Sequence, residues 1–191
     1  PGHLLMRHIR FRDRDGAVRE STLSAGEDIP GDVSLLRPLD PPEVWCSGVT
    51  YERSRDARIE ESGSDVYALV YDADRPELFL KDAAGRRTVG PGRPVAIRAD
   101  STWNMPEPEI GVVLGEGGRI EGVTIGNDVS SRDIEGANPL YLPQAKVYAG
   151  ACALGPAVYV PERRDPQHVF EISMRVRDAE GTVLFEGVTS T

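Results

Sequence analysis

Two glutamates and one aspartate have the spacing of a metal site. Glu107 and Glu109 stand two residues apart in MPEPEIGVVLG, and alternate residues of a strand point to the same face. Asp128 ends the next apolar segment, RIEGVTIGND, which follows the turn GEGG. If the two segments form a hairpin, Asp128 returns to the level of Glu107. Three carboxylates that meet at one point need a cation, and their hard oxygen atoms select magnesium, manganese or calcium.

A solvated strand face is the alternative interpretation of a Glu-x-Glu pair, because most carboxylates in proteins are exposed. The apolar run IGVVLG after the pair favours a buried strand instead. A histidine- or thiolate-based zinc site has little support from the composition. The chain has three histidines and two cysteines, which are His3, His8, His168, Cys46 and Cys152.

The basic residues provide two further candidates. Of the 22 lysines and arginines, only Lys81 and Lys146 are lysine. In a chain that favours arginine so strongly, a lysine persists where the planar and permanently charged guanidinium cannot replace it. We therefore expect a chemical role for these two residues, with chance retention as the alternative.

The elements that must position these residues are mostly strands. Asp15-Gly16 predicts a hairpin turn. Apolar and β-branched runs predict further strands at 43–50, 77–81, 93–99, 156–160, 169–178 and 182–188. Helices are expected at 51–62 and 66–73, and a polar, irregular segment from Asp128 to Gly150. The predicted fold is a β-rich α+β protein with a small N-terminal domain at 1–75 and the main domain at 76–191.

Composition excludes several classes of function. The 191 residues carry a formal net charge of −9, and the arginines are spread along the chain, so a nucleic-acid partner is not expected. No apolar run approaches the roughly 20 residues of a membrane helix. Two cysteines are too few for a disulfide framework, which favours a reducing, cytoplasmic location.

Three segments resemble the fumarylacetoacetate hydrolase-like superfamily in order and spacing. They are EPEIGVVLG, GNDVSSRD and QAKVYAGACALGP, and the resemblance extends over about 44–185. In that family a Glu-x-Glu pair and the aspartate of the second segment bind magnesium or manganese. The resemblance therefore implies Glu107, Glu109 and Asp128 as ligands of Mg²⁺ or Mn²⁺.

The same resemblance implies roles for the basic residues. Arg132 corresponds to a substrate contact, and Lys146 to the active-site lysine. Lys81 corresponds to the lysine of a Phe-x-Lys-Pro segment, although Asp82 replaces the proline here. The family fold is a small N-terminal domain followed by a mixed β-roll, and its members are homo-oligomers. Members are usually longer, so we expect the C-terminal part of the roll to be absent from this chain.

One departure from the family concerns the catalytic base. The hydrolytic and decarboxylating members have a histidine in a segment that corresponds to VTYERSRDARIEES, where Ser54 stands instead. Serine is not a base near neutral pH without an activator. This departure argues against hydrolysis.

The chain further resembles the sugar-acid branch of the family in the segments SRDARIEES, VYDADRPELFLKD and SSRDIEGANPLYLPQAKVYAG. This resemblance implies a metal-dependent dehydratase of a 2-keto-3-deoxy sugar acid. The expected reaction converts 2-keto-3-deoxy-D-arabinonate to 2,5-dioxopentanoate through a metal-stabilised enolate and loss of the C4 hydroxyl. Two alternatives remain open. One is a hydrolase or decarboxylase of a 1,3-dicarbonyl acid such as an acylpyruvate or oxaloacetate, and the other is a metal-binding relative without catalysis.

Lys146 is the first candidate for proton transfer, and Lys81 is the second. Glu77 alternates with Lys81 on one strand face and is a candidate substrate contact, with an ordinary surface carboxylate as the alternative. Gln144 and Ser54 are weaker candidates for substrate contact. For Arg132, an internal ion pair with Asp133 or Glu135 is the alternative to substrate binding.

Overall fold

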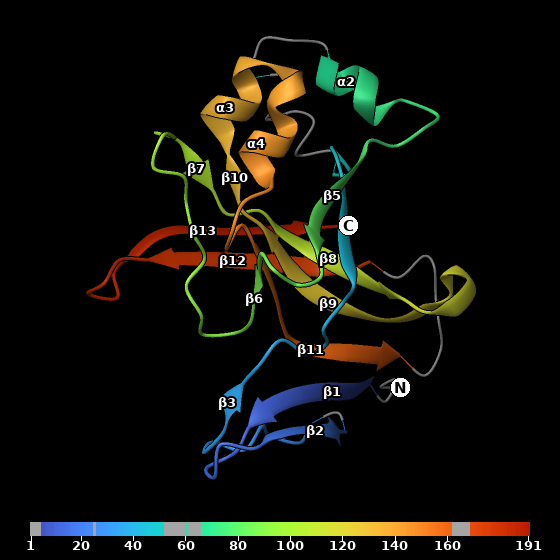
Figure 1. Ribbon diagram of the computed structural model, residues 1–191, viewed down its shortest axis with the longest axis vertical. Coiled ribbons are helices and arrows are strands. Elements are labelled where there is room, and N and C mark those ends of the chain that lie inside the picture. Colours follow the sequence, from blue (N-terminus) through green and yellow to red (C-terminus); the bar gives the residue numbers. More distant parts are fainter. Residues whose placement is uncertain (1–4, 25, 52–59, 61–65, 162–168) are drawn as a thin grey trace.

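The computed structural model describes residues 5–24, 26–51, 60, 66–161 and 169–191 (Figure 1). Strands predominate in these residues, and the helices are short. The predicted β-rich α+β class is therefore confirmed. No helix in the described ranges is long and apolar enough to cross a membrane.

The main sheet combines strands from both ends of the chain. Its order is β2 (Val18–Leu23), β1 (Leu5–Arg12), β11 (Cys152–Pro161), β9 (Ile120–Asp128) and β8 (Pro108–Leu114). Two short strands extend it, β3 (Ser34–Leu35) on β1 and β6 (Thr88–Val89) parallel to β11. All ladders other than that between β6 and β11 are antiparallel.

The main apolar core lies where β1, β2 and β11 meet. Ile9, Leu23 and Ala157 are buried there, and Phe11 and Tyr159 pack against them. The predicted hairpin turn is confirmed, since Gly16 has a φ of 82°, a conformation that glycine adopts without steric cost. Burial of these apolar side chains stabilises the β1–β2 hairpin against β11.

The hairpin that carries the candidate carboxylates is also confirmed. β8 and β9 are joined through the short turn η1 (Glu116–Gly118), and Glu109 pairs with Gly126. The Asp128 main-chain N–H donates to the Glu107 carbonyl oxygen at 2.9 Å. This bond places the last residue of β9 beside the residue that precedes β8.

The segment after Asp128 is helical, so the predicted irregular segment is wrong. It contains β10 (Ser130–Ser131), α3 (Arg132–Ala137), η2 (Pro139–Tyr141) and α4 (Leu142–Lys146), and β10 pairs with β7 (Asn104–Met105). Proline is the first residue of η2 and the second of α4, positions where a helix N–H has no partner within the helix, so its missing N–H has no cost. Helices of five or six residues show too little periodicity to be recognised from sequence.

The strand predicted at 93–99 is also absent from the described residues. Pro94 removes one ladder donor, and Gly92 has a positive φ, so the chain enters this segment through a turn. One main-chain bond, from Ala96 N–H to the Gly150 carbonyl oxygen at 2.9 Å, holds it in place.

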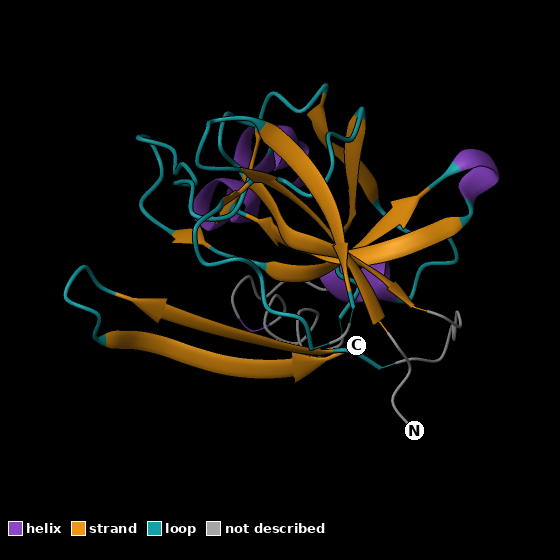
Figure 2. Cartoon of the chain, turned by 90° about the horizontal axis from the view of Figure 1, so that it is seen from below, coloured by secondary structure: helices purple, strands orange, loops and turns teal. Residues whose placement is uncertain are grey.

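Two smaller ladders complete the fold. β4 (Glu43–Ser47) pairs with β5 (Leu78–Ala83), and β12 (Glu171–Arg177) pairs with β13 (Val183–Ser190). Figure 2 shows the β12–β13 hairpin as a long arm that projects beyond the rest of the molecule. α2 (Val66–Tyr71) confirms the second predicted helix, whereas the helix predicted at 51–62 lies almost entirely outside the described residues.

The proposed boundary at 75/76 remains a prediction. Strands from its two sides share ladders, because β1 pairs with β11 and β4 pairs with β5. Figure 1 shows β1 and β2 at the opposite end of the molecule from α3 and α4.

Candidate metal centre and active site

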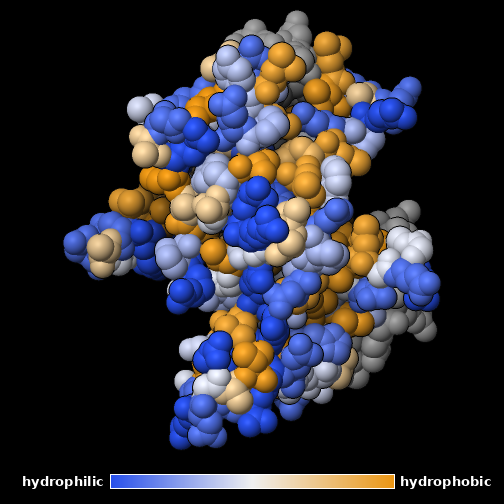
Figure 3. Space-filling model, in the orientation of Figure 1, coloured by the Kyte–Doolittle hydropathy of each residue, from blue (hydrophilic) through white to orange (hydrophobic). Residues whose placement is uncertain are grey.

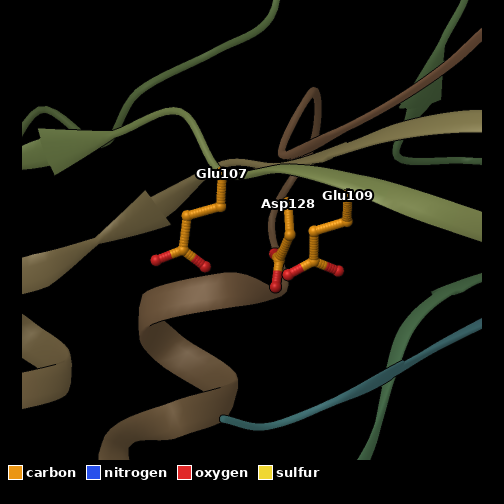
Figure 4. A group of neighbouring side chains, drawn as sticks. All are labelled: Glu107, Glu109 and Asp128. Atoms are coloured by element: carbon orange, nitrogen blue, oxygen red, sulfur yellow. The ribbon is translucent and has the colours of Figure 1, made fainter. Parts of the chain in front are cut away.

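Glu107, Glu109 and Asp128 point toward one another at the open end of the β8–β9 hairpin, away from its turn η1 (Figure 4). One carboxylate oxygen from each residue lies within 4.8 Å of the other two. In an octahedron with bonds of about 2.0–2.1 Å, neighbouring oxygens are roughly 3 Å apart and opposite ones roughly 4 Å apart. The three carboxylates therefore fit a magnesium-sized cation after a small closure.

The backbone at this open end of the hairpin explains why the three carboxylates converge. Pro106 and Pro108 interrupt the ladder on either side of Glu107, whose N–H donates instead to the Asn127 side-chain oxygen at 3.0 Å. Glu107 therefore lies outside regular pairing, while Glu109 is the second residue of β8. Asp128 is the last residue of β9 and is buried.

The surroundings of Glu109 disfavour the charged form of its carboxylate. Burial, together with the carboxylates of Asp128 and Glu107, raises the pKa of Glu109 to about 8. Among the side chains that the structure describes, none donates a hydrogen bond to its carboxylate. A divalent cation would remove this electrostatic conflict, so the residues present fit a metal.

Lys146 reaches the same point from the last turn of α4. Its Nζ donates to Glu107 Oε2 at 2.9 Å, to Asp128 Oδ2 at 3.0 Å and to Ser130 Oγ at 2.7 Å. Burial opposes the charged ammonium, but the carboxylates of Glu107 and Asp128 outweigh it and raise the pKa of Lys146. Phe79 adds a cation–π contact, with Nζ 5.6 Å from the ring centroid.

Lys81 lies behind the carboxylates, on β5, and is fully buried. Its Nζ forms an ion pair with Asp128 Oδ1. It also donates to the carbonyl oxygens of Val129 at 2.9 Å and of Lys146 at 2.5 Å. Both lysines thus converge on Asp128, one on each carboxylate oxygen.

Arg132 and Glu135 form a second charged pair, three residues apart on α3. Arg132 donates through Nη1 to Glu135 Oε2 at 3.0 Å and through Nη2 to Glu107 Oε1 at 2.5 Å. The internal ion pair considered from the sequence is thus formed with Glu135. Asp133 instead accepts from Ser101 and Thr102, which holds the start of α3 against the loop before β7.

A cavity of about 310 Å³ opens in front of these groups. Lys146, Arg132 and the three carboxylates form its charged wall. The opposite wall is the β12–β13 hairpin, and the side chains that it contributes include Ile172, Met174, Phe185, Val188 and Thr189. β12 also packs against β8, which keeps this apolar wall close to the carboxylates.

The other sequence candidates occupy different places. Glu77 lines the cavity directly before β5, and its carboxylate lies over Gly48, where a Cβ atom would collide with it at 2.1 Å. Lys81 is not among the residues that line the cavity. Gln144 is exposed and also outside the lining, and its main-chain oxygen accepts from Arg98. Ser54 lies outside the described residues.

Two residues of the site were not candidates from sequence. Glu135 lines the cavity as a buried acid, and its Oε1 is 4.0 Å from Lys146 Nζ. Ser130 accepts from Lys146 at the N-terminal side of α3. The sequence analysis included Glu135 as a possible ion-pair partner of Arg132, but its place in the cavity wall could be inferred only if 132–137 had been recognised as a helix.

Three carboxylates on a β-hairpin, a buried lysine beside them and a cavity in front of them fit a divalent cation. Residues 43–190 match the family model described as fumarylacetoacetate (FAA) hydrolase C-terminal. The chain therefore belongs to the fumarylacetoacetate hydrolase family, as the three sequence motifs predicted.

Similar proteins carry dehydratase names. The chain is 53% identical over 155 residues to a probable 2-keto-3-deoxyxylonate dehydratase from Haloferax volcanii, covering 81% of this chain and 53% of that protein. It is 47% identical over 165 residues to 2-dehydro-3-deoxy-D-arabinonate dehydratase from Saccharolobus solfataricus, covering 84% and 55%. The chain thus spans about half the length of these relatives.

A solved structure agrees in fold. It is 2-keto-3-deoxy-D-arabinonate dehydratase complexed with magnesium and 2,5-dioxopentanoate, with a TM-score of 0.73 and 34% sequence identity. The match covers 97% of this chain and 76% of that one.

Proposed function

We propose that this chain carries the metal centre of a magnesium- or manganese-dependent dehydratase, which converts 2-keto-3-deoxy-D-arabinonate to 2,5-dioxopentanoate. The observation that carries the proposal is the contact of Lys146 Nζ with two of the three candidate metal ligands, at the wall of a cavity. Sequence identities of 53% and 47% to proteins named as dehydratases support this chemistry over others in the family.

The charges at the site favour a divalent cation. Among the described side chains, five carboxylates (Glu77, Glu107, Glu109, Asp128 and Glu135) face three cationic groups (Lys81, Lys146 and Arg132). A divalent cation would balance this excess of negative charge. The cavity of about 310 Å³ has room for a five-carbon acid.

The reaction removes water without any oxidant or reductant. A proton leaves C3 and the hydroxyl leaves C4, which together form water. Protons then leave C5 and its hydroxyl and return to C3 and C4, which gives the aldehyde. The divalent cation supplies Lewis acidity at the C2 carbonyl, which makes the C3 proton more acidic.

The residues of the chain have distinct proposed roles. Glu107, Glu109 and Asp128 hold the cation. Lys146 moves a proton at its Nζ, because it is the cationic group that both lines the cavity and contacts two of those ligands. Arg132 orients Glu107, and Glu77 is placed to contact substrate hydroxyls from the side of β4 and β5.

A histidine base, as in the hydrolytic and decarboxylating members of the family, receives no support from the described residues. His8 lies on β1, where its ring pairs with Thr22, and no described histidine lines the cavity. The sequence also contains no histidine between His8 and His168.

The test uses full-length protein with Mg²⁺ and 2-keto-3-deoxy-D-arabinonate, and NMR to follow the products. We expect an aldehyde signal from 2,5-dioxopentanoate that disappears with a chelator. Within the D series, the arabinonate- and xylonate-derived substrates are one compound, since the stereocentres at C2 and C3 are lost. The L enantiomer is therefore the informative control for selectivity at C4.

Other substrates separate the alternatives. Rapid turnover of acylpyruvates or oxaloacetate, with no aldehyde from the sugar acid, would replace this proposal with a hydrolase or decarboxylase. Tight metal binding without turnover of any of these acids would indicate a relative without catalysis.

We also propose a homo-oligomer in the cytoplasm. Support for an oligomer comes from apolar side chains at the surface, which include Val112, Leu114, Ile120 and Ile125 on the β8–β9 hairpin. Figure 3 shows several such apolar patches among polar side chains. Both cysteines are free, which agrees with a reducing compartment. Light scattering of the full-length protein tests the oligomer.

A further inference from the structure

Lys81 has a setting unlike that of the other charged groups of the site. Its side chain is 0% exposed, and it does not line the cavity. We propose that Lys81 is a positioning residue, which fixes the Asp128 carboxylate and the main chain of Lys146 without touching the substrate. This inference rests on the proposed metal-dependent function.

The ammonium of Lys81 is enclosed by oxygen atoms of the protein. An ammonium group has three N–H donors and no acceptor. It donates to the carbonyl oxygens of Val129 and Lys146 and forms an ion pair with the Asp128 carboxylate. The cavity does not reach this ammonium, so a substrate hydroxyl has no access to it.

The three acceptors belong to parts of the chain that must be aligned for the site to form. Asp128 and Val129 lie where β9 ends, and Lys146 is the last residue of α4. The final carbonyl groups of a helix have no partner within the helix. Lys81 supplies one at Lys146, and so connects the end of α4 to the end of β9.

Asp128 shows how this arrangement prepares a metal ligand. Lys81 contacts its Oδ1 from the buried side, while Oδ2 faces Lys146 and, through it, Glu107. With Oδ1 held, the carboxylate cannot rotate away from the position where Glu107 and Glu109 converge. Groups that orient metal ligands in this way commonly influence metal affinity or activity by about 10–100-fold.

The chemistry of the ammonium explains why lysine persists here in an arginine-rich chain. Its three donors point in three directions from one atom. A guanidinium is planar and larger, and it cannot direct single bonds to the same three acceptors in this fully buried space.

The effect of a Lys81 substitution on metal affinity distinguishes a positioning role of this residue from a purely electrostatic one. Loss of a positive charge near the cation, by itself, would tighten metal binding, because a repulsion is removed. Loss of orientation would weaken it. For Lys81→Met in the full-length protein we expect Mn²⁺ binding, measured by calorimetry or electron paramagnetic resonance, to weaken by about 10–100-fold. Unchanged or tighter binding would overturn the proposal.

Two further variants complete the binding experiment. Lys81→Arg keeps the charge, and we expect it to fail to restore metal affinity. Full restoration by arginine would show that only charge matters. Arg86→Met removes a positive charge from an exposed neighbour in the chain and should leave affinity unchanged. These readouts need no substrate, so they remain decisive even if the proposed dehydration is not observed.

Kinetics give a second, independent readout. For Lys81→Met at saturating metal, we expect kcat to fall while KM for the sugar acid changes by less than about threefold, because Lys81 makes no substrate contact. A large rise in KM with unchanged metal affinity would instead make Lys81 a substrate-binding residue.

A measurement that leaves Lys81 itself unaltered covers the case in which the Lys81 variants do not fold. Residues 1–191 contain two lysines, so ¹⁵N-lysine labelling gives few side-chain signals, and Lys146→Arg identifies one of them. We expect the Lys81 Nζ–H signal to be protected from exchange and unmoved by substrate, while the Lys146 signal shifts. A substrate-dependent shift at Lys81 equal to that at Lys146 would refute the positioning role.

Discussion

The two buried regions of this molecule are built in opposite ways. At the end formed by β1, β2, β3 and β11, the buried cluster is apolar and consists of Ile9, Leu23 and Ala157. In the part of the molecule beside the cavity, several fully buried side chains are polar or charged, and they include Lys81, Asp82, Ser130 and Ser131. Full burial is therefore combined with charge in this region and with apolar side chains at the other end.

This difference shows which region depends for its stability on specific pairs of residues. An apolar core gains stability roughly in proportion to the area buried and tolerates similar shapes. A buried charge is tolerable only while its counter-charge stays in place, and removing one partner costs about 3–5 kcal/mol. The site thus depends on specific pairs such as Lys81 with Asp128, which the apolar end does not require.

Replacing Lys146 tests the chemical role of the polar region and has the largest expected effect. Lys146→Met keeps the length of the side chain but removes its Nζ. We expect sugar-acid dehydration to fall by about 10²–10⁴-fold, the usual contribution of a positioned proton-transfer group. The measurement is aldehyde formation at saturating Mg²⁺. Retained turnover in a folded variant would assign the proton transfer to another residue.

Replacing Asp128 compares the two regions directly by stability. Asp128→Asn leaves the buried ammonium of Lys81 without its counter-charge, so we expect a loss of about 3–5 kcal/mol in the free energy of unfolding. Ile9→Val in the apolar core should cost only about 0.5–1.5 kcal/mol. Urea unfolding of both variants without metal measures the two losses, and equal losses would contradict the contrast.

The sequence predicted the apolar and hairpin parts well, because their signals are local. The alternation around Asp15-Gly16 and the run after Glu109 define their strands without tertiary information. The convergence of Glu107 with Asp128 followed from hairpin geometry alone, and a main-chain bond between the two residues confirms it.

The helical and buried-charge parts could not be predicted in the same way. α3 and α4 are too short to show a helical period, so Glu135 was not recognised as a residue that faces Lys146. The arginine-rich composition singled out Lys81 but could not show that it lies behind the carboxylates rather than in the cavity. That distinction depends on the packing of β5 against the end of β9, which no local pattern encodes.

Metal binding should stabilise the polar region beside the cavity, and so reduce the difference in stability between it and the apolar end. A cation that binds the folded state at 100 times its dissociation constant contributes about 2.7 kcal/mol. For a chain of this size that corresponds to a rise in Tm of roughly 5–10 °C. We expect this rise with Mg²⁺ or Mn²⁺, measured by calorimetry, and its loss in Glu109→Gln. A Tm that neither cation changes would contradict the metal centre.

The smallest expected effect concerns Asp133, which holds α3 in place from outside the cavity. Hydrogen bonds from Ser101 and Thr102 lower the pKa of Asp133 from 3.8 to about 2. A carboxyl group with a lower pKa in the folded state stabilises the protein above pH 3.8, and this contribution is lost as the pH falls through about 2.

Asp133→Ala should therefore reduce the dependence of stability on pH between about 4 and 2, with less effect than any change inside the polar region. Urea midpoints measured across this range test the prediction, with Asp72→Ala as the control for an exposed acid. Identical pH profiles for Asp133→Ala and the unaltered protein would mean that these hydrogen bonds do not hold α3. α3 carries Arg132 and Glu135, which line the cavity. If the contribution of Asp133 to the free energy of unfolding were as large as that of Asp128, the polar region would extend to the surface through this helix.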